Sequence, residues 1–192
     1  MYEAALENNW EAARVLLEGD RNLAYEEITE AGDRALHVAI SMKHTDFAES
    51  LIELMNPCEL ELQDGQGYTA CCYAAIMGIV EVARSMIYKN ENLLHLRNLY
   101  GTTPLELAVS YGTAEMARLL LLHTNFYAFS REEWFGLFLV SVHSKMFGVV
   151  AAMLERDPCL AVMKGDDGRT ALHVLAQLDI SSGIKLHIID LH

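Results

Sequence analysis

Two adjacent cysteines, Cys71 and Cys72, are the residues whose type and spacing most suggest chemistry. A reactive thiol needs a positioned base, and a disulfide or a metal chelate needs two sulfur atoms that face each other. Consecutive residues on a helix point about 100° apart, so this pair suits neither arrangement. The other cysteines, Cys58 and Cys159, complete no zinc-type spacing with a histidine. The sequence therefore predicts packing thiols in a reducing compartment, with no metal and no cofactor.

The acid–base pairs of the sequence also fit a structural role better than catalysis. Glu-x-x-Arg recurs at Glu11, Glu81 and Glu115, which is the spacing of an ion pair on a helix surface. The sequence contains no phosphate-binding glycine loop and no G-x-S-x-G nucleophile motif. We therefore expect a protein without enzymatic activity.

The sequence segments around these residues recur at a regular spacing. The best copy, residues 101–120, reads G-T-T-P-L-E-L-A-V-S-Y-G-T-A-E-M-A-R-L-L, two short amphipathic helices separated by a glycine. Such a pair cannot bury its apolar faces alone and must stack on neighbours of the same shape. We predict an all-α solenoid of about six helix-turn-helix repeats with short β-hairpin tips. Equivalent positions recur at steps of 33 to 35 residues: Leu36, Cys71, Leu105, Phe138 and Leu172.

The period divides the chain into six segments and a tail. The first copy starts inside its own first helix, and the last copy has lost its second helix. We therefore expect a fragment or a truncated gene product, with open ends at Met1 and at residues 184–191 that are free to stack on another chain. Ser130, followed by two glutamates, predicts the start of the first helix of the fifth repeat. The predicted segments are 1–29, 30–63, 64–97, 98–131, 132–164 and 165–178, followed by a non-repeat tail at 179–192.

Composition narrows the class of partner. The chain has 192 residues, a net charge of −13 and a hydrophobic content of 52%. This acidic balance argues against nucleic acid and anionic membrane surfaces as direct partners. No apolar run approaches the roughly 18 residues of a membrane-spanning helix, and the polar, acidic start M-Y-E-A-A-L-E-N-N-W does not read as a signal peptide.

The repeated segment resembles an ankyrin repeat. The pattern of that family, Gly-x-Thr-Pro-Leu-His-x-Ala, a helix break and a second helix ending in Leu-Leu, is matched best at residues 101–120. Residues 67–87 fit with Ala70 in place of proline, and residues 32–52 fit with Arg34 in place of threonine. The phrases A-L-H-V-A-I-S-M-K-H-T-D-F and D-P-x-L-A-x-M-K-G-D-D-G-R-T-A-L-H-V-L-A resemble plant ankyrin proteins that carry a C-terminal PGG-type membrane domain.

The resemblance implies roles for the histidines and a place in the cell. His37 and His173 match the motif histidine that ties neighbouring hairpin loops together, and His44 matches a second structural position. His37 and His173 are four repeats apart, roughly 40 Å at the spacing of packed helices, so they cannot share a metal. The resemblance also implies a cytoplasmic location, or the cytosolic face of the plasma membrane in a full-length form, with roles in stress and defence signalling.

In ankyrin proteins the hairpin tips and the first helices line a concave groove, so the resemblance implies a binding surface at these positions. The free positions are apolar and aromatic in the middle of the array and acidic at its ends, which is typical of an interface with a charged rim. We expect a non-catalytic module that binds a protein segment with apolar anchors and basic flanks; the alternative is self-association through the open ends. The predicted contact residues are Met42, Gln66, Tyr68, Ile76, Met77, Leu99, Tyr100, Thr102, Ser110, Tyr111, His143, Ser144, Asp166 and Asp167, with Phe135 also expected at the surface.

Overall fold

The computed structural model describes residues 1–165 and 168–181, and every regular element in these ranges is helical. The first ten α-helices come in five pairs, and a short 3₁₀ helix follows each pair; one further α-helix ends the described part of the chain. The α-helices are α1 (Tyr2–Leu6), α2 (Trp10–Gly19), α3 (Ala35–Ser41), α4 (Thr45–Leu54), α5 (Ala70–Met77), α6 (Val80–Lys89), α7 (Pro104–Ser110), α8 (Ala114–His123), α9 (Arg131–His143), α10 (Phe147–Arg156) and α11 (Ala171–Ser181). The 3₁₀ helices are η1 (Arg21–Ala24), η2 (Pro57–Glu61), η3 (Glu91–Leu94), η4 (Phe126–Ala128) and η5 (Pro158–Ala161).

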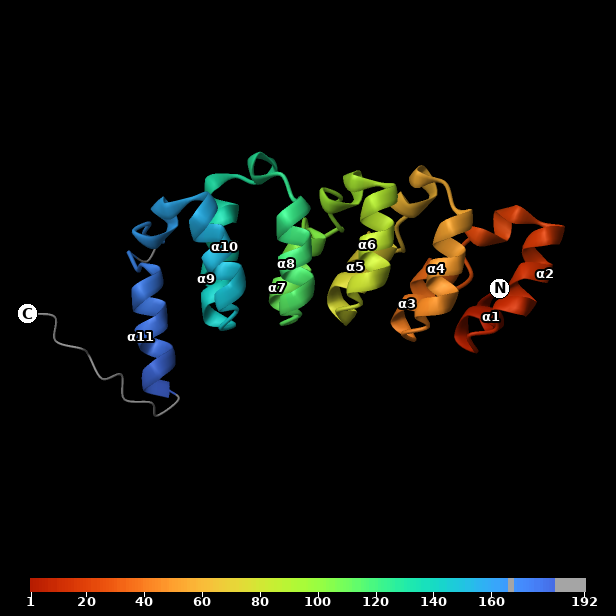
Figure 1. Cartoon of the computed structure of the whole chain (residues 1–192), viewed down its shortest axis with the longest axis horizontal. Helices are drawn as coiled ribbons and strands as arrows, with labels where there is room; N and C mark the ends of the chain where they lie inside the picture. Colours follow the sequence, from red (N-terminus) through yellow and green to blue (C-terminus); the bar gives the residue numbers. More distant parts are fainter. Residues whose placement is uncertain (166–167, 182–192) are drawn as a thin grey trace, which may run out of the picture. The chain divides into compact units, whose positions relative to one another are not determined.

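The chain divides into two compact units, Met1–Asn125 and a second unit that begins at Phe126. In the first unit, the first helices of consecutive pairs pack against one another, α1 on α3, α3 on α5 and α5 on α7. The second helices α4, α6 and α8 form a parallel row, so the pairs stand side by side in chain order (Figure 1). In the second unit, α9 contacts both α10 and α11. The predicted all-α solenoid of helix pairs is confirmed.

The core of the first unit repeats with the sequence period. Leu36, Cys71 and Leu105 hold the same place in α3, α5 and α7, and all three are fully buried. Burial raises the pKa of the Cys71 thiol far above its ordinary value. A thiol held neutral in this way is a packing group, as the sequence predicts. Cys72 is also buried, and its pKa is raised for the same reason.

The repeat tips are tight turns that bond to one another. Each carries at most a single antiparallel bridge, Glu27 with Arg34 and Gln63 with Thr69, and the described residues contain no extended strand. The predicted hairpin tips are therefore present only as turns with isolated bridges. The N–H of Gly65 donates to the carbonyl of Ala31 at 2.8 Å. This bond joins the second tip, which precedes α3, to the third tip, which precedes α5.

The third and fourth tips are joined in the same way, and a glycine makes the approach possible. The N–H of Leu99 donates to the carbonyl of Gln66 at 3.0 Å. The neighbouring Gly67 has a φ of 82°, and a Cβ at this residue would lie 2.7 Å from the Leu99 nitrogen. Only glycine therefore allows the two tips to come close enough for the bond.

The fifth pair begins where the sequence predicts. Ser130 caps α9: its hydroxyl accepts a hydrogen bond from the Glu133 N–H at 3.1 Å, and the Glu133 carboxylate accepts one from the Ser130 N–H at 2.8 Å. This reciprocal pair satisfies N–H groups that the helix itself leaves without partners.

The last described helix is longer than the sequence predicts. The expected first helix of the sixth repeat is residues 171–177, whereas α11 continues to Ser181 and so takes in the start of the predicted tail. The rest of that tail, residues 182–192, lies outside the described residues, and so does the whole predicted open end at 184–191. Across the described part of the chain, none of the helices combines the length and the apolar character needed to cross a bilayer.

Each helix pair of the first unit turns at one residue in the left-handed region. The values of φ are 57° at Asn8, 61° at Lys43, 70° at Gly78 and 79° at Gly112. Glycine adopts this conformation freely and asparagine tolerates it, but a lysine there is strained by its Cβ. The turn between α3 and α4 therefore forms in spite of its residue, held by the packing of the two helices.

This strain predicts stability changes of opposite sign. Gly112→Ala should lower the free energy of unfolding by about 1 kcal/mol, and Lys43→Gly should raise it by about as much. A Cβ at Gly112 would meet no atom within 4 Å, so the change acts on the backbone alone. Gly19→Ala is the matched control: it also meets no atom within 4 Å, but it lies in α2 and should be neutral or stabilising. Urea titrations that show equal effects for the two alanines would contradict the argument.

Candidate protein-binding surface

Three tyrosines gather where the third and fourth repeats meet. Tyr68 precedes the N-cap of α5, Tyr100 lies in the fourth tip, and Tyr111 is the C-cap of α7. Tyr100 and Tyr111 are 71% and 61% exposed, while Tyr68 is half-buried and packs edge-on against Tyr73 at 6.2 Å between ring centroids. The cluster therefore combines one anchored ring with two rings that are free to meet a partner.

The phenols of Tyr68, Tyr100 and Tyr111 lie close enough to interact electrostatically. Burial raises the pKa of Tyr68, and the phenols of Tyr111 and Tyr100 raise it further. Asn98 acts in the opposite direction, because its amide favours the phenolate. The Tyr68 phenol therefore remains neutral at physiological pH. All three tyrosines offer a hydroxyl group and ring faces to a partner.

Asn98 holds the fourth tip beneath these rings. Its side-chain oxygen accepts hydrogen bonds from the N–H groups of Tyr100 at 3.0 Å and Thr102 at 2.9 Å. These two bonds fix the orientation of the amide, and its Nδ2 is buried with no acceptor in hydrogen-bonding geometry among the described residues. The Asn98 amide is close enough to the Tyr68 phenol to lower its pKa, but the phenol does not accept a hydrogen bond from Nδ2. Asp64, at the equivalent place in the third tip, uses its second oxygen to accept from Tyr73.

The other predicted contact residues of the first unit differ in exposure. Leu99 is 76% exposed beside Tyr100, and Met42, at the C-cap of α3, is 47% exposed. Gln66 and Ser110 are exposed, while Ile76, Met77 and Thr102 are half-buried. All of these residues belong to tips or to the C-terminal ends of first helices, as the repeat register requires. Their role in binding stays a prediction.

The residues of the second unit that are predicted to lie at the surface differ in exposure. His143 and Ser144 are exposed at the C-terminal end of α9. Phe135 is 6% exposed, so the expectation that it faces solvent is wrong. The cause is the helix in which it lies: α9 has 13 residues, and Phe135 is turned inward, where its ring stacks on that of Phe138 at 6.4 Å. Asp166 and Asp167 lie outside the described residues.

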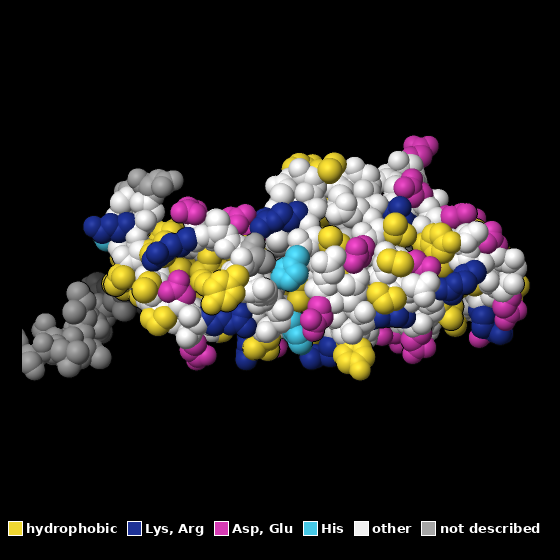
Figure 2. Space-filling model, turned by 90° about the horizontal axis from the view of Figure 1, so that it is seen from above, with side chains coloured by type: hydrophobic (Ala, Val, Ile, Leu, Met, Phe, Trp, Pro, Cys, Tyr) yellow, Lys and Arg dark blue, Asp and Glu magenta, His cyan; other side chains and the backbone are white. Residues whose placement is uncertain are grey.

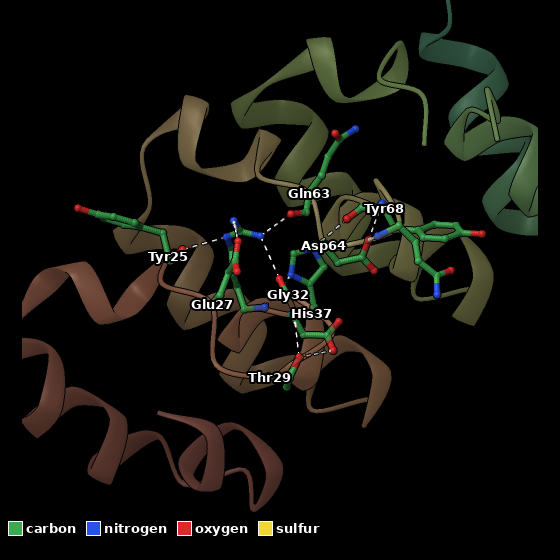
Figure 3. Close-up of polar contacts among 11 residues, drawn as sticks. Tyr25, Glu27, Thr29, Gly32, His37, Gln63, Asp64 and Tyr68 are labelled. Carbon is green, nitrogen blue, oxygen red and sulfur yellow. Dashed lines mark hydrogen bonds and ion pairs between the residues drawn. The ribbon is translucent and has the colours of Figure 1, made fainter. Parts of the chain in front are cut away.

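Arg34 is a buried arginine that hydrogen-bonds to two successive tips, a role that the sequence did not predict. The Arg34 guanidinium donates to the carbonyls of Tyr25 at 2.9 Å, Gly32 at 3.2 Å and Gln63 at 2.5 Å, and it pairs with Glu27 at 3.2 Å. These groups converge from two successive tips (Figure 3). The fork of donors of a guanidinium suits this task, because carbonyls in three directions need donors in a fixed plane. The one sequence signal of this role was that Arg34 stands where the repeat pattern has threonine.

His37 continues the same support. Its Nδ1 accepts a hydrogen bond from the Arg34 N–H at 3.1 Å, and its Nε2 donates to the carbonyl of Tyr68 at 3.2 Å. The backbone partners thus select the neutral tautomer with the proton on Nε2. Burial lowers the pKa of His37, although Asp33 and Asp64 partly oppose the shift. The predicted structural role of His37 is confirmed, and it links the second repeat directly to the backbone of Tyr68.

Tyr73 joins the second and third tips through two carboxylates. Its phenol lies 3.0 Å from Asp33 Oδ1 and 2.9 Å from Asp64 Oδ2. Burial and these two carboxylates raise the pKa of Tyr73 far above its ordinary range. The Asp64 carboxylate also accepts from the N–H groups of Gln66 and Tyr68 at 2.8 Å, so the tip that carries Tyr68 is held at several points.

Other polar side chains of the described residues hydrogen-bond to the backbone of neighbouring segments. His44 Nδ1 lies 3.0 Å from the carbonyl of Ala5, which confirms its structural role, and Thr113 holds the carbonyl of Ala75 in the equivalent way at 2.8 Å. His173 lies within the second unit, where its Nδ1 contacts the Thr170 hydroxyl at 2.8 Å. In residues 1–165 and 168–181, no group of three or more histidine, cysteine, aspartate or glutamate side chains is placed to hold a metal ion.

Comparison with known proteins agrees with this architecture. Residues 51–132 match a family model described as ankyrin repeats in three copies. Residues 51–132 of this chain therefore read as ankyrin repeats. The crystal structure of the ankyrin repeat protein EF0377 superposes with a TM-score of 0.74 over 93% of this chain and 91% of that chain, at 22% identity. A fold of this kind is in general a non-catalytic scaffold for protein partners.

A plant protein is a further relative. A protein from Oryza sativa subsp. japonica, named probable E3 ubiquitin-protein ligase XBOS32, is 29% identical over 121 residues. The match covers 63% of this chain and 24% of the rice protein, so the chain spans about a quarter of the length of this relative.

Removal of Arg34 should loosen the tips. Arg34→Ala leaves the carbonyls of Gly32 and Gln63 without their donors, which should cost about 2–4 kcal/mol of unfolding free energy. Arg34→Lys should recover only part of the loss, because one ammonium cannot reach three carbonyls. Urea titration gives the loss, and hydrogen exchange should rise most in the second and third tips. Full stability of the alanine variant would show that water replaces the guanidinium without cost.

The neutral state of His37 predicts how stability changes with pH. Because the pKa is lower in the folded state than the unfolded value of about 6.5, the unfolded chain takes up a proton first. Stability is therefore complete above about pH 6.5 and falls as pH drops below it, by at most about 1.4 kcal/mol per pH unit. His37→Gln should flatten the dependence between pH 6.5 and 5.5, while His173→Gln, at an exposed histidine, should leave it unchanged. Equal slopes for wild type and His37→Gln would contradict the assignment.

Proposed function

We propose that this chain captures a segment of a protein partner on the surface formed by Tyr68, Tyr100 and Tyr111 and the residues around them. The observation that carries the proposal is the clustering of these rings from three separate places in the sequence, two of them widely exposed. Tyrosine gives a large contact area at low entropic cost and is enriched among residues that dominate binding energy. Leu99 adds an exposed apolar side chain at the same tip.

Rigid support strengthens the case for binding. The backbone of Tyr68 is held by His37 and Asp64, and the tip of Tyr100 is held by Asn98. A surface whose backbone is fixed in advance loses little conformational entropy when a partner binds. The net charge of −13 favours partner segments with basic residues beside the apolar anchors, since opposite charges steer the encounter.

The relatives also support a proposal about the wider setting of this chain. The phrases shared with plant ankyrin proteins and the match to the rice protein support a plant protein, and we propose a role in stress or defence signalling. The location that goes with this role is the cytoplasm, or the cytosolic face of the plasma membrane in a longer form. The proposed activity is binding alone, with no reaction carried out by this chain.

A peptide library displayed on phage, selected against the whole chain, tests the proposal. Tyr100→Ala combined with Tyr111→Ala should weaken the selected peptides by at least about 100-fold, because each ring is expected to contribute about 2 kcal/mol. Adding Tyr68→Ala should abolish binding, and the selected peptides should carry basic residues and lose affinity at higher salt. Tyr2→Ala, at an exposed tyrosine of α1, is the control and should bind normally.

Two results would overturn the proposal. One is a set of selected peptides whose affinity is unchanged in the double variant. The other is a loss of binding that is matched by a loss of thermal stability, since Tyr100 and Tyr111 are exposed and their removal should shift the melting temperature by no more than a few degrees.

A further inference from the structure

One position on the second helices changes character in the middle of the array. It lies ten residues after the left-handed turn residue of each pair. Three copies carry glutamate here, Glu18, Glu53 and Glu155, as expected for an exposed helix surface. The third and fourth repeats carry Tyr88 and Leu122 instead. Two adjacent repeats have thus replaced a charge with a large apolar side chain at the same register.

The structure leaves both side chains at the surface. Tyr88 is 94% exposed and Leu122 is 70% exposed. They lie on α6 and α8, which pack side by side within the first unit. A cleft of about 360 Å³ opens at this place, lined by Arg84, Ile87, Tyr88, Glu91, Leu119 and His123. Exposed apolar side chains beside a cleft are typical of an interaction surface.

The charged residues beside Tyr88 could pair with the same residues in a second copy of the chain. Arg84 lies one helical turn before Tyr88 on α6, and Glu91 begins η3 just after the end of that helix. The cleft lining therefore carries one positive and one negative side chain together with the Tyr88 ring. A two-fold axis through Tyr88 would set two α6 helices antiparallel. This arrangement places Arg84 of each copy opposite Glu91 of the other, with the two tyrosine rings between them. Self-complementarity of this kind is what an isologous dimer requires.

We propose that this surface, made of Arg84, Tyr88, Glu91 and Leu122, binds a second copy of this chain. Two chains of charge −13 repel each other at long range, but the Debye length is only about 8 Å at physiological salt, so local pairs decide the contact. The first repeat of the first unit carries three exposed glutamates, Glu3, Glu7 and Glu11, whereas the cleft lining carries both signs of charge. The face of the molecule seen in Figure 2 shows both signs of charge interspersed with apolar groups over this unit.

The proposed dimer is independent of the tyrosine surface. It uses second helices, whereas Tyr68, Tyr100 and Tyr111 belong to tips and to the end of a first helix. Two large side chains and one cleft in each copy suit a weak, reversible contact with a dissociation constant in the micromolar range.

Sedimentation of the whole chain from about 1 to about 100 μM tests the inference, because dimers form by mass action. Wild type should shift from monomer to dimer across this range. Tyr88→Glu combined with Leu122→Glu places at both sites the residue that three other repeats carry, so the fold should keep its melting temperature. This variant should remain monomeric throughout. A wild type that is monomeric at every concentration, or a double variant that dimerises like wild type, would overturn the inference.

A charge exchange makes the test specific for self-association. Arg84→Glu alone should weaken the dimer by at least about 10-fold, because it sets glutamates opposite each other. Adding Glu91→Arg restores the pairing between copies and should restore the dimer. Failure of this rescue in a folded protein would contradict the antiparallel arrangement. The Tyr100 and Tyr111 alanine variant should dimerise normally, so the outcome is separate from that of the peptide-binding experiment.

Discussion

The hydrogen bonds between successive tips are the constraint on which the first unit depends. A tip pairs only some of its backbone groups within itself, as Asp64 does with Tyr68, and it bonds others to the next tip, Gly65 to Ala31 and Leu99 to Gln66. Arg34 adds a buried guanidinium between two tips. These bonds set the distance between neighbouring repeats. At this distance the first helices pack against one another and bury Leu36, Cys71 and Leu105. Every surface residue on the tips inherits its spacing from this arrangement.

The same constraint explains where function can reside. Motif positions are occupied by packing, caps or bonds between repeats, as with His44 and Thr113, which hold carbonyls of the preceding repeat. Only positions that the motif leaves free can vary without loss of the fold. In this chain the free positions of the third and fourth repeats are the unusual ones. Their tips carry tyrosines, and the second helices carry Tyr88 and Leu122 where other repeats have glutamate. Both proposed contacts therefore fall on the same two repeats, on different elements.

Much of the fold is readable because each repeat is a local unit. The period identifies the helix pairs, the glycine at position 112 marks a turn, and Ser130 with its glutamates marks the start of α9. The burial of Cys71 follows from its motif position alone. Reading fails where the motif is lost. Phe135 was placed at the surface by register, but α9 is longer than a standard first helix and turns this ring toward Phe138.

By itself the sequence determined the repeat, the helix pairs and the list of positions free to bind, because these depend on spacing within about 34 residues of chain. Tertiary structure alone decided which of those positions meet. Tyr68, Tyr100 and Tyr111 become one cluster, and Tyr73 reaches both Asp33 and Asp64, only after separate tips have docked. The role of Arg34 was settled in the same way, since its carbonyl partners lie 9 and 29 residues away. Contacts between repeats depend on distances across the stack, and a one-dimensional pattern does not contain them.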